Sequence, residues 1–141
     1  MSDPTHLAWG DLETGGLNGR QPDGSLGMES LPIFEIAIIV TNLALDIIGE
    51  PLHIIIHHDE ASIERCHPEA LAMHQKSGLL DEVRASRITL AEAEQHIMHY
   101  LDSLGIKKYD RKARTGVGSG GIVIWCADDQ VIQTIAVHIA G

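Results

Sequence analysis

The sequence predicts an α/β fold in which helices flank a mixed sheet. Three short apolar segments of strand character precede residue 59, and amphipathic helical segments follow with one further strand among them. That order of elements is typical of α/β domains. Because a single hydrophobic core commonly serves roughly 100 to 200 residues, the 141 residues predict one domain spanning 1–141.

The first expected strand covers residues 6–13. Apolar residues at its start run into acidic ones, and Gly15 and Gly16 follow, as is typical of a buried strand that ends in a turn. Residues 18–30 are rich in Gly, Asn, Asp, Ser and Pro and lack periodicity, so we expect a loop there.

The next two strands form a predicted hairpin. Residues 33–40 are β-branched and almost continuously apolar, which predicts a central strand buried on both faces. A turn at 46–50 leads to the expected antiparallel partner at 52–58. Glu35 lies inside the central strand, where a carboxylate needs a partner. We expect it to be a structural hydrogen-bond acceptor near the acidic pair described below. The alternative is an outer-shell group that supports that pair.

Helices are expected to follow. Residues 61–78 have helical character, but Pro68 is tolerated only in a first helical turn, so two short helices are predicted. Thr89 and Glu92 then form a capping box at the start of a longer helix, and Gly105 ends it with a left-handed cap. Five apolar residues at spacings of three and four predict the face of this helix that packs on the sheet: Leu90, Ala93, Ile97, Leu101 and Leu104.

The last third of the chain predicts a basic loop, a strand and a helix at residues 107–114, 122–126 and 128–140. The net charge of −10 argues against a broad basic surface that grips long nucleic acid through many phosphates. Five of the ten Lys and Arg residues nevertheless lie at 107–114. This segment is either a solvated loop or a rim that contacts phosphate groups.

Composition also indicates where the protein works. No segment approaches the ~20 apolar residues of a membrane span, and the N-terminus lacks the pattern of a secretory signal. We therefore expect a cytoplasmic protein with no membrane partner. Cys66 and Cys126 lie far apart, which indicates reduced thiols. The nine histidines lack the short fixed pairs of zinc sites, so we expect them to be exposed on strand edges and helices.

A pair of carboxylates carries the predicted chemistry. Asp11 and Glu13 are two residues apart at the end of the first strand, so both side chains point to the same side of the sheet. Mg²⁺ and Mn²⁺ prefer oxygen ligands and commonly bind a few carboxylates together with substrate phosphates. Taken alone, the pair also fits a strand that runs into a solvated turn.

The residues around this pair resemble the oligoribonuclease family of DEDD-class 3′→5′ exonucleases. Residues 9–17 are similar to the family's first motif, a Trp-x-Asp-x-Glu strand followed by a threonine, a glycine turn and a leucine. Residues 32–37 resemble its second strand, and residues 73–80 resemble the helix-turn segment before its long helix. The likeness spans residues 6–105 in the family's order and spacing.

The resemblance implies a ribonuclease H-like fold and a homodimer. It implies hydrolysis of short single-stranded oligoribonucleotides from the 3′ end with two Mg²⁺ or Mn²⁺ ions. Asp11, Glu13 and Asp128 would be the catalytic metal ligands. Asp129 is the alternative to Asp128, which could also merely cap the last helix. Four residues would bind substrate: Thr14, Leu17, His74 and Ser77. Of these, Leu17 would wedge against a terminal base.

The sequence also departs from the family pattern. Gly15 stands where the family has a threonine, and Glu69 lies near the position of its tryptophan. The family's third motif, a His or Tyr base and a fourth metal-binding Asp, would lie beyond Gly141. We therefore expect a chain truncated after the second motif, with the C-terminal part of the fold missing and weak or no activity. Two alternatives stay open: a non-catalytic oligonucleotide-binding module on the same fold, and a proofreading-type 3′→5′ DNA exonuclease.

Overall fold

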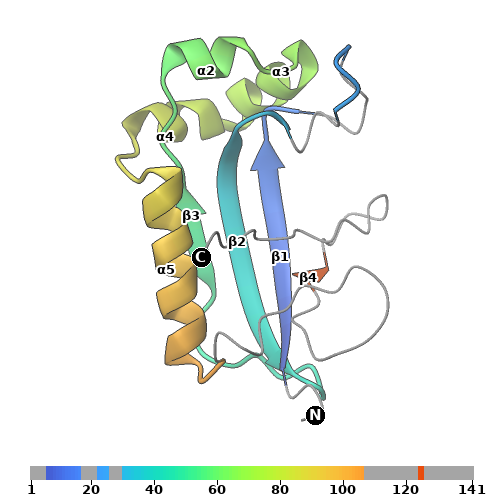
Figure 1. Cartoon of the computed structure of the whole chain (residues 1–141), viewed down its shortest axis with the longest axis vertical. Coiled ribbons are helices and arrows are strands. Elements are labelled where there is room, and N and C mark those ends of the chain that lie inside the picture. The colour runs from blue at the N-terminus through green and yellow to red at the C-terminus, as the bar shows by residue number, and fades with distance from the viewer. Residues whose placement is uncertain (1–5, 17–21, 26–29, 107–123, 126–141) are drawn as a thin grey trace. The chain divides into compact units, whose positions relative to one another are not determined.

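The computed structural model describes residues 6–16, 22–25, 30–106 and 124–125 (Figure 1). The chain divides into two compact units, each assembled from separate stretches of sequence. The first unit comprises Met1–Asp11, Ala37–Leu52 and His96–Gly141, and the second comprises Leu12–Ile36 and His53–Gln95. The expectation of one domain over residues 1–141 stays a prediction.

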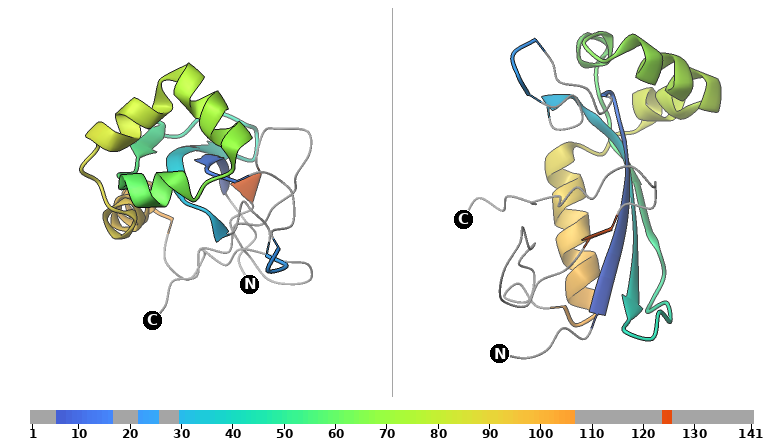
Figure 2. Two further views of the ribbon diagram at one scale, coloured as in Figure 1. Left: turned by 90° about the horizontal axis from the view of Figure 1, so that it is seen from above. Right: turned by 90° about the vertical axis from the view of Figure 1, so that its right-hand side faces the viewer.

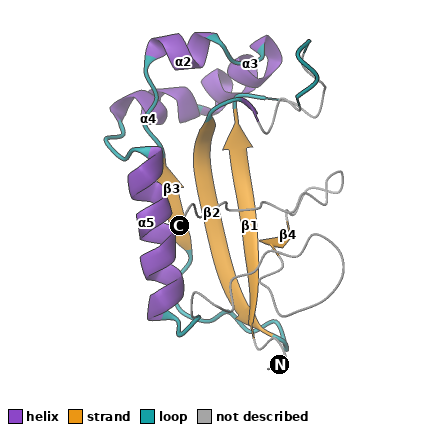
Figure 3. Ribbon diagram, in the orientation of Figure 1, coloured by secondary structure: helices purple, strands orange, loops and turns teal. Residues whose placement is uncertain are grey.

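Four strands form one sheet in the order β3-β2-β1-β4 (Figure 3). The first three strands run antiparallel, and β4 pairs with β1 in parallel, with Ala8 opposite Ile124. The predicted α/β class with a mixed sheet is therefore confirmed. The strand bounds are β1 (His6–Thr14), β2 (Ile33–Asn42), β3 (Leu52–Ile55) and β4 (Ile124–Trp125).

β2 is buried mainly on one face, so the prediction of burial on both faces is wrong. Its buried side chains alternate with more exposed ones, as strand geometry requires. Ile39, on the other face, is 36% exposed. The β-branched residues on that face therefore reflect strand propensity rather than complete burial. The buried members of the strand include Phe34, Ile36, Ile38 and Val40.

In the first unit, the chain turns earlier after β2 than the sequence predicts. Asn42 organises the turn, because its Oδ1 accepts hydrogen bonds from the backbone N–H groups of Ala44 and Asp46 at 2.8 and 3.0 Å. Leu45 takes a positive φ of 69°, and Ile47 already bridges back to Thr41. The turn expected at 46–50 thus begins within three residues of β2.

In the second unit, β3 ends at Ile55 rather than at residue 58 as predicted. The Ile56 N–H still donates to the Phe34 carbonyl at 2.8 Å, but the His57 N–H donates to the Ile88 carbonyl at 2.7 Å. A tertiary partner on the segment before the long helix therefore replaces the strand pairing.

The helices are α2 (Glu60–Glu64), α3 (Pro68–Ser77), α4 (Leu79–Ala85) and α5 (Leu90–Ser103). Pro68 begins α3, which confirms the predicted break into two short helices. Gly78, with φ 85°, ends α3 where the predicted helical segment 61–78 ends, but α4, which follows directly, was not predicted. Proline at 68 and glycine in a left-handed conformation at 78 each interrupt a helix, so a new helix begins at or after each of them.

The predicted capping box of α5 is confirmed. The Glu92 N–H donates to Thr89 Oγ1 at 3.2 Å, and the Thr89 N–H donates to Glu92 Oε2 at 2.8 Å. Gly105 has the expected positive φ, 78°. On the expected packing face, Ala93 and Leu101 are buried, but Leu90 is 45% exposed. Leu90 is the first helical residue, so its position at the helix end leaves it outside the packed face.

Within the first unit, the second half of α5 lies along one face of the strand segments (Figure 2). The turn before β3 packs closely against the end of this helix. A Cβ atom on Gly49 would lie 2.6 Å from Leu104 Cδ2, and Gly49 has a φ of 70°. The positive φ therefore favours glycine at position 49, and a larger residue would also displace the end of the Leu104 side chain.

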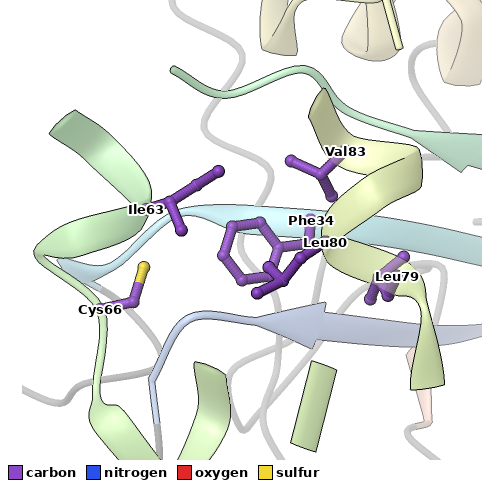
Figure 4. Packing of buried hydrophobic residues seen from close by; sticks show 6 residues of the cluster. All are labelled: Phe34, Ile63, Cys66, Leu79, Leu80 and Val83. Carbon is purple, nitrogen blue, oxygen red and sulfur yellow. The ribbon is translucent and has the colours of Figure 1, made fainter. Parts of the chain in front are cut away.

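The core of the second unit surrounds the Phe34 ring (Figure 4). Phe34 comes from β2 and has no exposed surface. Its neighbours come from α2, α4 and the link between α2 and α3. They are Ile63, Cys66, Leu79, Leu80 and Val83.

Several predicted features fall outside the described residues. They are most of the loop at 18–30, the basic segment 107–114 and the helix at 128–140. Of the strand predicted at 122–126, the structure describes only Ile124–Trp125 as β4. No helix in the described part of the chain is long and apolar enough to cross a membrane.

Candidate metal and substrate site

Asp11 and Glu13 lie on the accessible face of β1. Asp11 is exposed, and the Glu13 side chain is 41% exposed. Gly10 and Thr14, which point to the other face, are buried. Two carboxylates that share the accessible face of one strand are hard oxygen donors, the type of ligand that Mg²⁺ and Mn²⁺ take.

The turn after β1 is held by hydrogen bonds on both sides. The Gly15 N–H donates to the Pro32 carbonyl, and the His67 N–H donates to the Gly15 carbonyl, each at 2.8 Å. Thr14 is 6% exposed, and its Oγ1 lies 3.3 Å from the Gly16 N–H. The side chain of Thr14 thus closes the turn, and its predicted contact with substrate stays a prediction.

Gly15 is packed directly against Cys66. A Cβ atom at Gly15 would lie 2.1 Å from Cys66 Sγ and 2.8 Å from Cys66 Cβ. Cys66 is buried, and burial raises the pKa of its thiol. The thiol therefore occupies the space that a side chain at position 15 would need.

His74 joins α3 to the end of β1. It is 3% exposed, and its Nε2 lies 2.8 Å from the Thr14 carbonyl oxygen. The same nitrogen is 3.9 Å from Glu13 Oε2. The expectation that the histidines are exposed is therefore wrong for His74. Its predicted role in binding substrate stays a prediction.

Ser77 makes hydrogen bonds at the end of α3. Its Oγ donates to the His74 carbonyl at 3.1 Å and accepts from the Leu79 N–H at 3.4 Å. These bonds support the junction between α3 and α4. The predicted substrate contact of Ser77 stays a prediction, and the predicted Leu17, Asp128 and Asp129 lie outside the described residues.

Glu35 has a partner that the sequence did not reveal. Its Oε1 contacts His53 Nε2 on β3, and the two side chains are 26% and 56% exposed. Two other histidines bond to backbone carbonyls, because His57 Nδ1 lies 3.2 Å from the Val83 oxygen and His58 Nε2 lies 2.7 Å from the Ile33 oxygen. These histidines have structural partners in the second unit.

The described residues contain no group of three or more His, Cys, Asp or Glu side chains arranged to hold a metal ion. Asp11 and Glu13 would supply two ligands by the chemistry of their carboxylates, and Asp128, the predicted third, is outside the described part. The carboxylate pair thus fits a divalent cation in donor type.

The fold and the carboxylate pair together define a class. A mixed sheet with antiparallel β1, β2 and β3, with β4 parallel to β1 and helices following β3, is ribonuclease H-like. Asp11 and Glu13 lie at the end of β1 in this fold.

Comparison with known proteins shows which members of this fold class the chain is similar to. No protein-family model matches the chain. It is 38% identical over 101 residues to the oligoribonuclease of Nocardia farcinica, which covers 72% of this chain and 42% of that protein. It is 41% identical over 95 residues to the oligoribonuclease of Rhodococcus jostii, covering 67% and 43%. For the oligoribonuclease of Mycobacterium avium the identity is 37% over 95 residues, covering 67% and 40%.

The predicted resemblance to the oligoribonuclease family is therefore confirmed over about two thirds of the chain. The matched residues amount to less than half the length of these relatives.

Proposed function

We propose that this protein is a metal-dependent 3′→5′ exoribonuclease that acts on short single-stranded oligoribonucleotides. One observation carries the proposal. Asp11 and Glu13 share the accessible face of β1 in a chain that is 36–41% identical to proteins named oligoribonuclease. As part of the same proposal, the protein is cytoplasmic and forms a homodimer.

Asp11 and Glu13 would hold two Mg²⁺ or Mn²⁺ ions together with Asp128. When bound, such a pair lowers the pKa of a coordinated water and neutralises charge on the transferring phosphoryl group. The residues of this chain keep the carboxylates in place. The turn at Gly15 is fixed by hydrogen bonds to two other segments, and the carboxylates stay open to an approaching phosphodiester.

The proposed reaction is hydrolysis of the last phosphodiester bond. Water oxygen bonds to phosphorus, the bond from phosphorus to the 3′ oxygen of the preceding nucleotide breaks, and that oxygen takes a proton. The products are a nucleoside 5′-monophosphate and an oligonucleotide shorter by one residue. Thr14, Leu17 and Ser77 are the proposed substrate contacts.

The test is trimming of a two- to five-nucleotide RNA by the 141-residue protein in Mn²⁺. We expect slow release of nucleoside monophosphates, which EDTA abolishes by removing the metal and Asp11→Ala abolishes by removing one of its ligands. Glu64→Ala is the matched control, since it removes an exposed carboxylate on α2 and should leave trimming unchanged. Trimming that persists in EDTA would overturn the proposal.

The same assay separates the two alternatives. A non-catalytic binding module would bind the oligonucleotide equally well in the parent and in Asp11→Ala, and would show no turnover in Mn²⁺. A proofreading-type exonuclease would trim DNA oligomers faster than RNA oligomers of equal length.

A further inference from the structure

His74 is a buried histidine whose ring is held on several sides. Its ring forms a T-shaped pair with the Phe34 ring, with 5.5 Å between centroids and an interplanar angle of 88°. Its own carbonyl accepts a hydrogen bond from Ser77 Oγ at 3.1 Å. The ring is therefore fixed in position by the packed core of the second unit.

The hydrogen bond to β1 settles which nitrogen carries a proton. Nε2 lies 2.8 Å from the Thr14 carbonyl oxygen, and a carbonyl oxygen can only accept. His74 Nε2 therefore donates. The bond spans 60 residues of sequence and reaches the residue directly after Glu13, whose Oε2 lies 3.9 Å from the same nitrogen.

We propose that His74 is a positioning residue for the metal-binding carboxylate Glu13. By donating to the Thr14 carbonyl, it fixes the end of β1 and thereby the direction of the neighbouring Glu13 side chain. The part concerning metal rests on the function proposed above. The low exposure of His74 distinguishes the positioning role from the predicted contact with substrate. A side chain that is 3% exposed presents little surface to a ligand.

Two substitutions separate hydrogen bonding from packing. In His74→Gln the side-chain amide can reach the place of Nε2 and still donate to Thr14. In His74→Leu the apolar volume largely remains but the donor is lost. Partners that orient metal ligands typically contribute ten- to a hundredfold to metal affinity. We expect His74→Leu to weaken Mn²⁺ binding, measured by electron paramagnetic resonance, about tenfold. His74→Gln should stay within about threefold of the parent.

A second measurement does not depend on metal. The Gly15 N–H, bonded to the Pro32 carbonyl, reports on the turn after β1, and the Ile56 N–H, bonded to the Phe34 carbonyl, is the internal control. We expect His74→Leu to speed hydrogen exchange at Gly15 about tenfold more than at Ile56. His74→Gln should change neither amide.

The outcomes are distinguishable. If the parent binds no Mn²⁺, the proposed function fails, and exchange at Gly15 alone decides the positioning role. Equal effects of the Gln and Leu variants, or unchanged Gly15 exchange in His74→Leu, would overturn the inference. Should His74→Leu not fold, His74→Gln decides: retained Gly15 protection supports the inference, and its loss contradicts it.

Discussion

Gly15 and Cys66 show how one residue near the site depends on another far away in sequence. The Cys66 thiol fills the space beside Gly15, and the backbone of Gly15 is bonded to Pro32 and His67. A larger residue at either position would push the turn away from the link between α2 and α3. The two positions should therefore behave as a coupled pair.

We predict that Gly15→Ala lowers the free energy of unfolding by about 1–3 kcal/mol, because overpacked sites cost this much. Cys66→Ala removes the sulfur atom that the new methyl group would strike. Gly15→Ala should therefore cost about 1 kcal/mol less in the Cys66→Ala background than in the parent. Urea denaturation of the four proteins in this cycle measures the coupling. Additive effects of the two substitutions would contradict it.

At the scale of elements, α2 depends on a capping carboxylate. Asp59 is its N-cap, and its Oδ1 accepts from the Ser62 N–H at 2.8 Å. The hydrogen bonds from Ser62 lower the pKa of Asp59 below its usual 3.8. A carboxyl group whose pKa is lowered in the folded state stabilises that state above its unfolded pKa. This contribution is lost as the pH falls through the folded pKa.

We predict that Asp59→Ala lowers the melting temperature at pH 7, because α2 loses its cap. The difference from the parent should shrink as the pH falls below about 4, where the parent's own carboxyl group becomes protonated. Thermal unfolding followed by circular dichroism at pH 7 and pH 2.5 tests this. Asp59→Asn is a suitable control, since an uncharged amide oxygen can still cap the helix at both pH values. A pH-independent difference between Asp59→Ala and the parent would contradict the prediction.

The same scale shows which elements can be predicted from spacing. The capping box of α5 and the break at Pro68 were predicted because each depends on residues within one helical turn. The end of β3 was not, because the His57 N–H bonds to the distant Ile88 carbonyl. The helix α4 was missed because its seven residues are too few to show a clear helical period.

At the scale of the whole molecule, metal binding and folding should be linked. A ligand that binds only the folded state stabilises it by about 2.7 kcal/mol at a concentration one hundred times its dissociation constant. We predict that saturating Mn²⁺ raises the melting temperature of the parent by several degrees, and that EDTA reverses the shift. Asp11→Ala and Glu13→Gln should show a reduced shift or none, whereas Glu64→Ala should respond like the parent. An equal shift in all four proteins would place the bound Mn²⁺ elsewhere.

Local sequence by itself determined much of this protein. The spacing of Asp11 and Glu13 on one strand face and the capping of α5 both depend on residues close together in the chain. Such features are decided by backbone geometry and short-range hydrogen bonds, which spacing alone specifies.

Only the tertiary structure decided how the end of β1 is held. It brings Cys66 against Gly15. It also brings the His74 ring to the Thr14 carbonyl, across 60 residues of sequence. It also gives Glu35 its partner His53. Contacts of this kind depend on which surfaces pack together, and residue spacing carries little information about that choice. The sequence therefore predicted the carboxylate pair, and packing determined what holds the end of β1.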